Sequence, residues 1–158
     1  MIDSHPQAQI REFRTVIPTT MDAMIAFHEA PEALAMLTPP PLIIQVLRDD
    51  RESFAEGEIE FRLWFGPLPV RWLARHEAGP TPTSFADRMI EGPMAYWLHQ
   101  HIFAEVEGGI ELVDRIQLAH KTGLSGLVSR LMFDGLAMRF LFFYRHLRTK
   151  MALKGKSQ

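Results

Sequence analysis

The amino-acid sequence predicts an α+β fold: a curved antiparallel sheet of about six to seven strands wrapped around a long C-terminal helix, with two short helices after the first strand. Three observations lead to this prediction. Residues 58–65 alternate apolar and polar side chains with the period of two that marks a half-buried strand. Glycine- and proline-containing turns separate further strand-like segments up to residue 123. Residues 127–153 follow the helical period of 3.6 residues instead.

The N-terminal part of the chain predicts one strand and two short helices. Residues 10–17 mix β-branched, aromatic and charged side chains, as strands do. Thr19 or Thr20 can cap the first helix with a side-chain oxygen, and Pro31 suits the first turn of the second. The run of Thr38 and three prolines then ends the second helix and starts an extended turn.

The middle of the chain predicts strands joined by turns. Gly108 and Gly109 form a hairpin-turn signal between the last two strands. Gly-Pro pairs mark other turns, because proline cannot donate to a ladder of backbone hydrogen bonds. The predicted strands in this region are residues 42–47, 58–65, 70–76, 85–91, 99–106 and 110–120.

The C-terminal segment predicts one helix from about residue 127 to about residue 153, roughly 40 Å long at 1.5 Å per residue. Its charged side chains gather on one stripe, formed by Arg130, Asp134, Arg145 and Arg148. The opposite stripe is apolar and wider than a surface helix needs, so we expect it to pack on the sheet and the helix to be well buried. That apolar stripe comprises Val128, Met132, Leu136, Phe140, Phe143 and Leu147.

Composition and charge limit the possible partners. The 158 residues suit one domain over the whole length, with residues 1–8 and 154–158 expected to be flexible. A net charge of −2 gives no electrostatic support for binding nucleic acid or an anionic membrane. The absence of cysteine excludes disulfides, thiol catalysis and cysteinate metal sites, and it fits a cytoplasmic protein. No signal peptide is visible, and charges interrupt the most apolar segment, residues 131–147, so we expect no membrane insertion.

The order of the predicted elements and four short motifs carry a resemblance to a known superfamily. The motifs are FHEAPEAL at 27–34 with LTPP at 37–40, FAD at 85–87 with GP at 92–93, WLHQHIF at 97–103, and LVDRI at 112–116. Together they resemble the helix-grip fold of START and Bet v 1-like proteins, and locally the small bacterial ligand-binding proteins related to polyketide cyclases and dehydrases. The resemblance covers almost the whole chain. It implies a cavity between sheet and helix that binds a small hydrophobic molecule.

Asp114 is the most informative single residue. It lies on the apolar face of the predicted strand 110–120, between Leu112 and Ile116, where an unpaired carboxylate is costly. It therefore needs a partner, a raised pKa or a wet cavity. We favour a structural carboxylate satisfied by a neighbouring strand or loop. The alternative is a group that faces the cavity and orients a ligand.

His99 and His101 share one face of the predicted strand 99–106, although the other face is more apolar, so an outward orientation stays open. A His-x-His pair can begin a metal site, with Asp87 or Asp114 as a further ligand. Two ligands do not make a zinc site, so we expect no metal and no cofactor. We prefer a polar end of the cavity formed by these four residues. The same four are the candidates for acid–base catalysis if the protein is an enzyme.

Large apolar side chains supply the expected wall of the cavity. Arg139 departs from the charged stripe of its helix. We favour a packed stem with the guanidinium in water; the alternative is a cation at the cavity wall that binds an acidic ligand group or Asp114. The expected ligand-binding residues are Phe61, Trp72, Trp97, His99, His101, Asp114, Met132, Leu136, Arg139, Phe140 and Phe143.

Three functions remain open at this point. The first is a non-enzymatic binder or carrier of a lipid-like, aromatic or polyketide-like molecule. The second is a cyclase- or dehydrase-type enzyme that uses a His/Asp acid–base pair. The third is a regulatory interaction module without a small ligand, whose cavity would be filled by Phe140 and Phe143 against Trp72 or Trp97. We expect no nucleic-acid partner and leave a homodimer open.

Overall fold

The structure is a computed structural model that describes residues 5–156, so part of both ends expected to be flexible lies outside the described residues. Within that range, seven strands form one antiparallel sheet and four helices accompany it, which confirms the predicted α+β fold. The strands are β1 (Gln9–Ile17), β2 (Ile43–Ser53), β3 (Glu56–Phe65), β4 (Leu68–Ala78), β5 (Phe85–Glu91), β6 (Tyr96–Val106) and β7 (Gly109–Ala119). The helices are α1 (Met21–Glu29), α2 (Ala33–Met36), α3 (Gly123–Phe133) and α4 (Gly135–Leu153).

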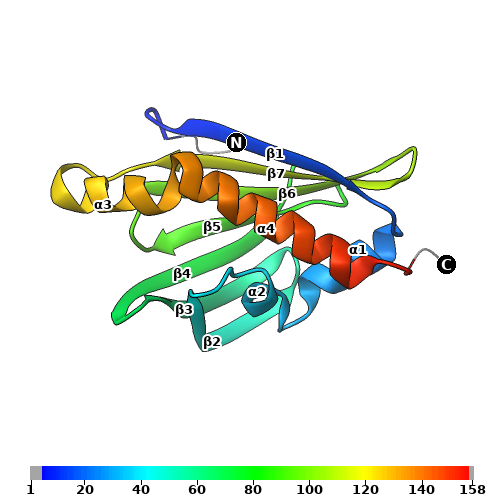
Figure 1. Ribbon diagram of the computed structural model, residues 1–158, viewed down its shortest axis with the longest axis horizontal. Coiled ribbons are helices and arrows are strands. Elements are labelled where there is room, and N and C mark those ends of the chain that lie inside the picture. The colour runs from blue at the N-terminus through cyan, green and yellow to red at the C-terminus, as the bar shows by residue number, and fades with distance from the viewer. Residues whose placement is uncertain (1–4, 157–158) are drawn as a thin grey trace.

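The sheet is an open meander of β2 to β7, to which β1 is added at the β7 edge. Strands β2 to β7 pair in chain order, and β1 pairs with β7, so the sheet order is β1-β7-β6-β5-β4-β3-β2. Phe13 of β1 lies opposite Asp114 of β7 in this register. The sheet curves around α4, which crosses it on one side (Figure 1).

The turn chemistry of the N-terminal segment explains the start of α1. The Thr20 hydroxyl accepts a hydrogen bond from the backbone N–H of Ala23, and Asp22 lies in the first turn, near the positive end of the helix dipole. Of the two predicted caps, Thr20 is therefore the one that acts. The helix ends at Glu29, shortly before Pro31.

The C-terminal segment differs from the prediction of one continuous helix, because Asp134 separates α3 from α4. Asp134 has extended backbone dihedrals (φ −144°, ψ 173°), and its carboxylate accepts a hydrogen bond from the N–H of Gly135 at 2.9 Å. Gly135 has φ +57°, a left-handed value that glycine adopts without strain. An N-cap aspartate followed by glycine thus starts a new helix inside the expected one.

The apolar stripe expected to be buried faces outward instead, and this part of the prediction is wrong. Leu136 is 82% exposed and Phe143 66% exposed. Val128, Phe140 and Leu147 are also exposed, and only Met132 of the expected stripe is half-buried. The buried side of α4 is formed by Met138, Phe142, Thr149 and Leu153.

Two contacts explain which side of α4 meets the sheet. The ring of Phe142 stacks on that of Phe13, with centroids 4.6 Å apart. One turn later, Nε2 of His146 lies 2.7 Å from a carboxylate oxygen of the buried Asp114. A helix turned toward the expected face would withdraw this donor and leave a buried charge with fewer partners, which is costly.

The interior consists of two apolar clusters with polar groups between them. One cluster centres on Trp72, Trp97 and Phe142, and the other on Phe85 and Phe103. The ring of His99 contacts that of Phe142, and the ring of His101 stacks on that of Phe85, so the two histidines join the clusters. Across residues 5–156, none of the helices is long and apolar enough to cross a membrane.

Candidate functional site

A cavity of about 350 Å³ lies between the sheet, α2 and α4. Strands β3 and β4 supply its floor, the segment after α2 supplies one rim, and α4 supplies the opposite rim. Most of the wall is apolar. It includes Leu34, Leu37, Leu42, Ile59, Phe61, Leu63, Trp72, Trp97, Met132, Phe133 and Phe140.

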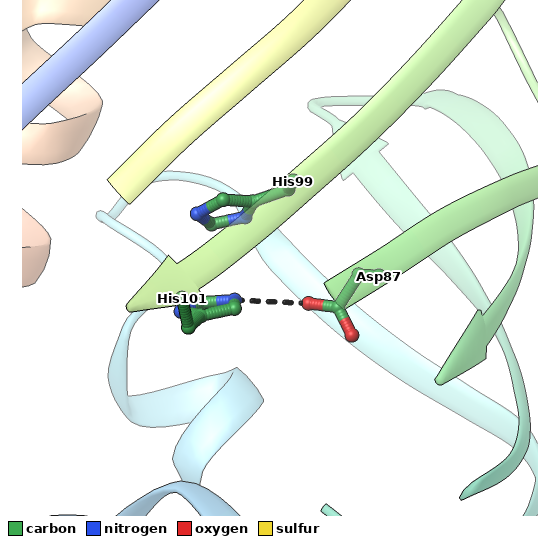
Figure 2. Close-up of side chains that lie close together, drawn as sticks. All are labelled: Asp87, His99 and His101. Atoms are coloured by element: carbon green, nitrogen blue, oxygen red, sulfur yellow. Dashed lines mark hydrogen bonds and ion pairs between the residues drawn. The ribbon is translucent and has the colours of Figure 1, made fainter. Parts of the chain in front are cut away.

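One end of the cavity is polar. His99 and His101 extend from β6 on the same side as Asp87 of β5, and the three side chains approach one another (Figure 2). The register of the two strands places Asp87 opposite His99, which explains this proximity. Four further polar side chains from α1, β2, β4 and α4 complete this end: His28, Arg51, His76 and Arg145.

The half-buried Asp87 and the buried Asp114 are joined through His101. Its Nε2 lies 3.0 Å from Oδ2 of Asp87, and its Nδ1 lies 3.1 Å from Oδ1 of Asp114. Asp114 also lies 2.6 Å from Nε2 of His99 and 2.7 Å from Nε2 of His146, while Asp87 lies 2.8 Å from Nε2 of His76. Because an ionised carboxylate only accepts hydrogen bonds, the Nε2 atoms of His99, His101 and His146 donate in the three hydrogen bonds of this network. The contacts of His76 with Asp87 and of His101 Nδ1 with Asp114 are close ion-pair distances without hydrogen-bond geometry.

These contacts set the charge of each group. Burial alone would raise the pKa of Asp114, but contacts with His101, His146 and His99 outweigh burial and hold that pKa well below its usual range. Burial of Asp87 is likewise outweighed, mainly by His76 and His101, and its pKa is also well below the usual range. Burial would lower the pKa of His101, yet its contacts with the two carboxylates raise it. Two ionised aspartates therefore favour the protonated form of the histidine between them.

His99 has the opposite protonation state. Burial, together with the charge of His101, lowers the pKa of His99 to about 4 despite its bond to Asp114. The two rings are close, with centroids 3.9 Å apart. A neutral histidine and a protonated one thus lie side by side at the polar end of the cavity, which is a pattern that acid–base sites use.

Arg145 is the cation of the site that has no acceptor. Its guanidinium reaches the cavity from α4, and among the described residues no atom accepts a hydrogen bond from it. Burial lowers its pKa, while the charges of Asp114 and Asp87 oppose that effect. Arg51, by contrast, binds Asp49 at 2.6 Å. Because a guanidinium has five N–H donors, Arg145 offers unused donors to a molecule in the cavity.

Most residues expected to bind a ligand lie at the cavity. Phe61, Trp72, Trp97, His99, His101, Met132 and Phe140 line it, and so does the candidate catalytic residue Asp87. Asp114 lies behind the two histidines and contacts them without lining the cavity. Three expected residues lie elsewhere: Leu136, Arg139 and Phe143 are exposed on the outer side of α4.

Five polar residues of the site were missed from the sequence: His28, Arg51, His76, Arg145 and His146. Arg145 was assigned to a solvated stripe because its helical neighbours there are charged. For His146 the sequence carries a weak signal, because it lies at the edge of the wide apolar arc of this helix. For Arg145, on the opposite charged stripe, the helical pattern carries none.

Asp87, His99 and His101 offer ligand atoms that all lie within 4.8 Å of one another, a set that could hold a metal ion. Metal ligation needs neutral imidazole and free lone pairs. Here the two carboxylates favour the protonated form of His101 by raising its pKa, and Asp87 already contacts two histidines. The geometry therefore favours a proton-linked network at this end of the cavity.

Comparisons with known proteins identify the fold. No family model matches the sequence, and no curated protein sequence matches it. Solved structures do match. A nucleoside-diphosphate sugar epimerase from Corynebacterium glutamicum superimposes with a TM-score of 0.64 and 25% identity over 89% of this chain, which spans only 28% of the epimerase.

Two other solved structures match over nearly their whole length. The Zhui aromatase/cyclase from a Streptomyces species has a TM-score of 0.66 and 12% identity, covering 96% of this chain and 94% of its own. A protein from Chromobacterium violaceum has a TM-score of 0.65 and 12% identity, covering 92% of this chain and 96% of its own. These likenesses confirm the helix-grip fold that the sequence motifs predicted.

Proposed function

We propose that the protein binds one small, largely apolar molecule in the cavity, and that an oxygen-bearing group of this ligand, a carboxylate above all, binds Arg145. The apolar wall excludes water from most of the ligand surface, and the few convergent polar groups at one end fix its orientation. A ligand of this kind fits the coarse expectation for the fold. The cavity is also open, with about 350 Å³ of space, which counts against a regulatory module with a filled interior.

The observation that carries the proposal is the unused guanidinium. The Arg145 guanidinium is half-buried and has no acceptor among the described residues, so an anionic ligand group would form a charge-assisted hydrogen bond there. Asp87 and Asp114 hydrogen-bond histidines, and neither forms an ion pair or hydrogen bond with Arg145. The ligand therefore supplies the missing acceptor.

Two fluorescent molecules with the same aromatic body test the proposal. Anilinonaphthalene sulfonate carries an anionic group that stands in for a carboxylate, and N-phenylnaphthylamine lacks it. Replacing Arg145→Met should weaken binding of the sulfonate about tenfold or more, as expected for loss of a hydrogen bond to a charged group, and should leave the neutral amine nearly unchanged. Fluorescence titration measures both dissociation constants.

Arg139→Met is the matched control, because Arg139 lies on the same helix but is exposed outside the cavity. It should change neither dissociation constant. If Arg145→Met weakened both molecules equally, or neither, the assignment of Arg145 as the anchor would be wrong. Binding of either molecule to the outer side of α4 would not respond to Arg145→Met, so the two modes are distinguishable.

A second candidate function, an acid–base enzyme of the cyclase or dehydrase type, is favoured by the pair His99 and His101. A neutral base and a protonated acid stand next to each other at the cavity wall. Such reactions begin with removal of a proton next to a carbonyl group. Exchange of that proton of α-tetralone for solvent deuterium, followed by NMR, tests this. Catalysed exchange that is abolished by His99→Gln and preserved by Arg139→Met would support an enzyme. Exchange no faster than in buffer alone would support the non-enzymatic binder instead.

A further inference from the structure

The outer side of the C-terminal helices is unusually apolar for a surface. On α4, Leu136, Phe140, Phe143, Leu147 and Met151 recur every three or four residues and are all exposed, so they form one continuous stripe. Leu124, Leu127 and Leu131 are exposed on α3, which leads into α4 along the same side of the sheet (Figure 1). We call these eight residues the outer apolar face. Clusters of exposed apolar side chains such as this one mark sites that bind another molecule.

Basic side chains border the outer apolar face. Residues 123–156 carry seven lysines and arginines and one acidic residue, Asp134, although the whole chain has a net charge of −2. Arg130, Arg139, Lys150 and Lys154 are exposed. From the net charge of the whole chain we expect no electrostatic support for binding to an anionic surface. That net charge conceals a strongly positive C-terminal segment in an otherwise acidic protein.

We propose that the outer apolar face docks on an anionic phospholipid bilayer, with α3 and α4 lying flat at the interface. A helix that lies at a membrane interface inserts its exposed apolar side chains into the boundary of the acyl chains. The lysine and arginine side chains that flank them contact anionic headgroups. Neither helix is long and apolar enough to span a membrane, so the described helices lie on the bilayer rather than cross it.

Charge argues against a second copy of the chain as the occupant. A twofold contact through the outer apolar face would bring the flanking basic residues of one copy, such as Arg139 and Lys150, toward the basic residues that flank the same face of the other copy. Asp134 is half-buried and bound to Arg11. Like charges at such a contact are destabilising. An anionic bilayer pairs with the same cations.

Docking through the outer apolar face would bring the cavity close to the bilayer. Phe140 belongs to the outer apolar face and also lines the cavity. In the docked orientation one rim of the cavity therefore meets the apolar phase. This consequence rests on the proposed function, whereas docking itself does not, since it depends on side chains outside the cavity.

Vesicle flotation tests the docking. The full chain should float with vesicles of phosphatidylglycerol and phosphatidylcholine, and binding should fall steeply at high salt and with phosphatidylcholine alone. Replacing Arg139→Glu and Lys150→Glu should weaken binding about fivefold or more per position. Leu136→Glu should reduce it by at least tenfold. Because Leu136 is 82% exposed, this variant should fold, which circular dichroism checks.

Two matched controls lie elsewhere on the surface. Leu68→Glu replaces an exposed leucine at the start of β4, and Arg62→Glu reverses an exposed charge on β3. Both should float like the wild type. Flotation that responds equally to controls and α4 variants, or no flotation with anionic vesicles, would overturn the proposal. So would a dimer in light scattering that Leu136→Glu dissociates. Arg145→Met should still float, which separates this test from that of ligand binding.

Discussion

Nε2 of His99 lies 2.6 Å from Oδ1 of Asp114, and both side chains are almost fully buried. Asp114 does not line the cavity, but it contacts the two histidines that do. Both interpretations of Asp114 that the sequence allowed thus describe part of its surroundings: it is paired by neighbouring elements, and it stands directly behind the polar end of the cavity.

Replacing Asp114→Leu should destabilise the protein by about 3–5 kcal/mol, because it leaves a protonated histidine without one of its two carboxylates. Urea denaturation at neutral pH measures the free energy of unfolding. Glu105→Gln, an exposed site on β6, is the control and should stay within about 0.5 kcal/mol of the wild type. A loss below about 1 kcal/mol for Asp114→Leu would contradict a buried charge network. In the folded fraction, we expect the neutral naphthylamine still to bind.

Stability should fall as the pH drops from 7 to 5, because of two buried histidines. Burial lowers the pKa of His28 to about 3 and that of His99 to about 4, against an ordinary value of 6.5. When the folded-state pKa of a histidine is depressed, its contribution to the free energy of unfolding is fully present above pH 6.5. That contribution is lost as the pH falls toward the folded-state pKa, and the loss at pH 5 is roughly 2 kcal/mol per histidine. His101 acts in the opposite direction, since its pKa is raised.

The variant His28→Phe isolates one of these groups. Its ring would remain among the rings of Phe27, Phe85 and Phe103 but would not titrate. The loss of unfolding free energy between pH 7 and pH 5 should be about 2 kcal/mol smaller in this variant than in the wild type. Asp87 and Asp114 do not confuse the comparison, because their low pKa values place their effect at more acidic pH. Identical pH dependence in both proteins would contradict the buried neutral His28.

Divalent metal should not stabilise the protein. Zinc would have to displace the protons that join His101 to Asp87 and to Asp114, and those carboxylates would lose their donors. After treatment with a chelator, an excess of Zn²⁺ should leave the melting temperature unchanged, and Co²⁺ should give no visible absorption of a tetrahedral site. A rise in melting temperature that His99→Ala removes would instead establish a metal centre.

Local patterns predicted the sheet well for a physical reason. The period of two in β3 and the Gly-Pro turns act within a few residues, and the alternation of β7 placed Asp114 on a buried face correctly. Antiparallel hairpins then pair neighbours in chain order, so the topology of β2 to β7 needs little long-range information.

The orientation of α4 could not be predicted in this way. Helical periodicity shows which side chains share a face, but the face that meets the sheet depends on contacts far apart in the chain. Here the demand of Asp114 for donors selects the side with His146 and brings Arg145 to the cavity. That demand arises from burial by the whole fold, and a reading of the helix alone assigns Arg145 to solvent.

Native mass spectrometry with anilinonaphthalene sulfonate tests whether a single ligand binds inside the cavity. We expect a one-to-one complex for the wild type. The complex should be lost in Ala137→Trp, which fills the cavity from α4, and unchanged in Ala104→Trp, at an exposed site on β6. A complex that survives Ala137→Trp, or several molecules bound without a preferred stoichiometry, would contradict binding in the cavity.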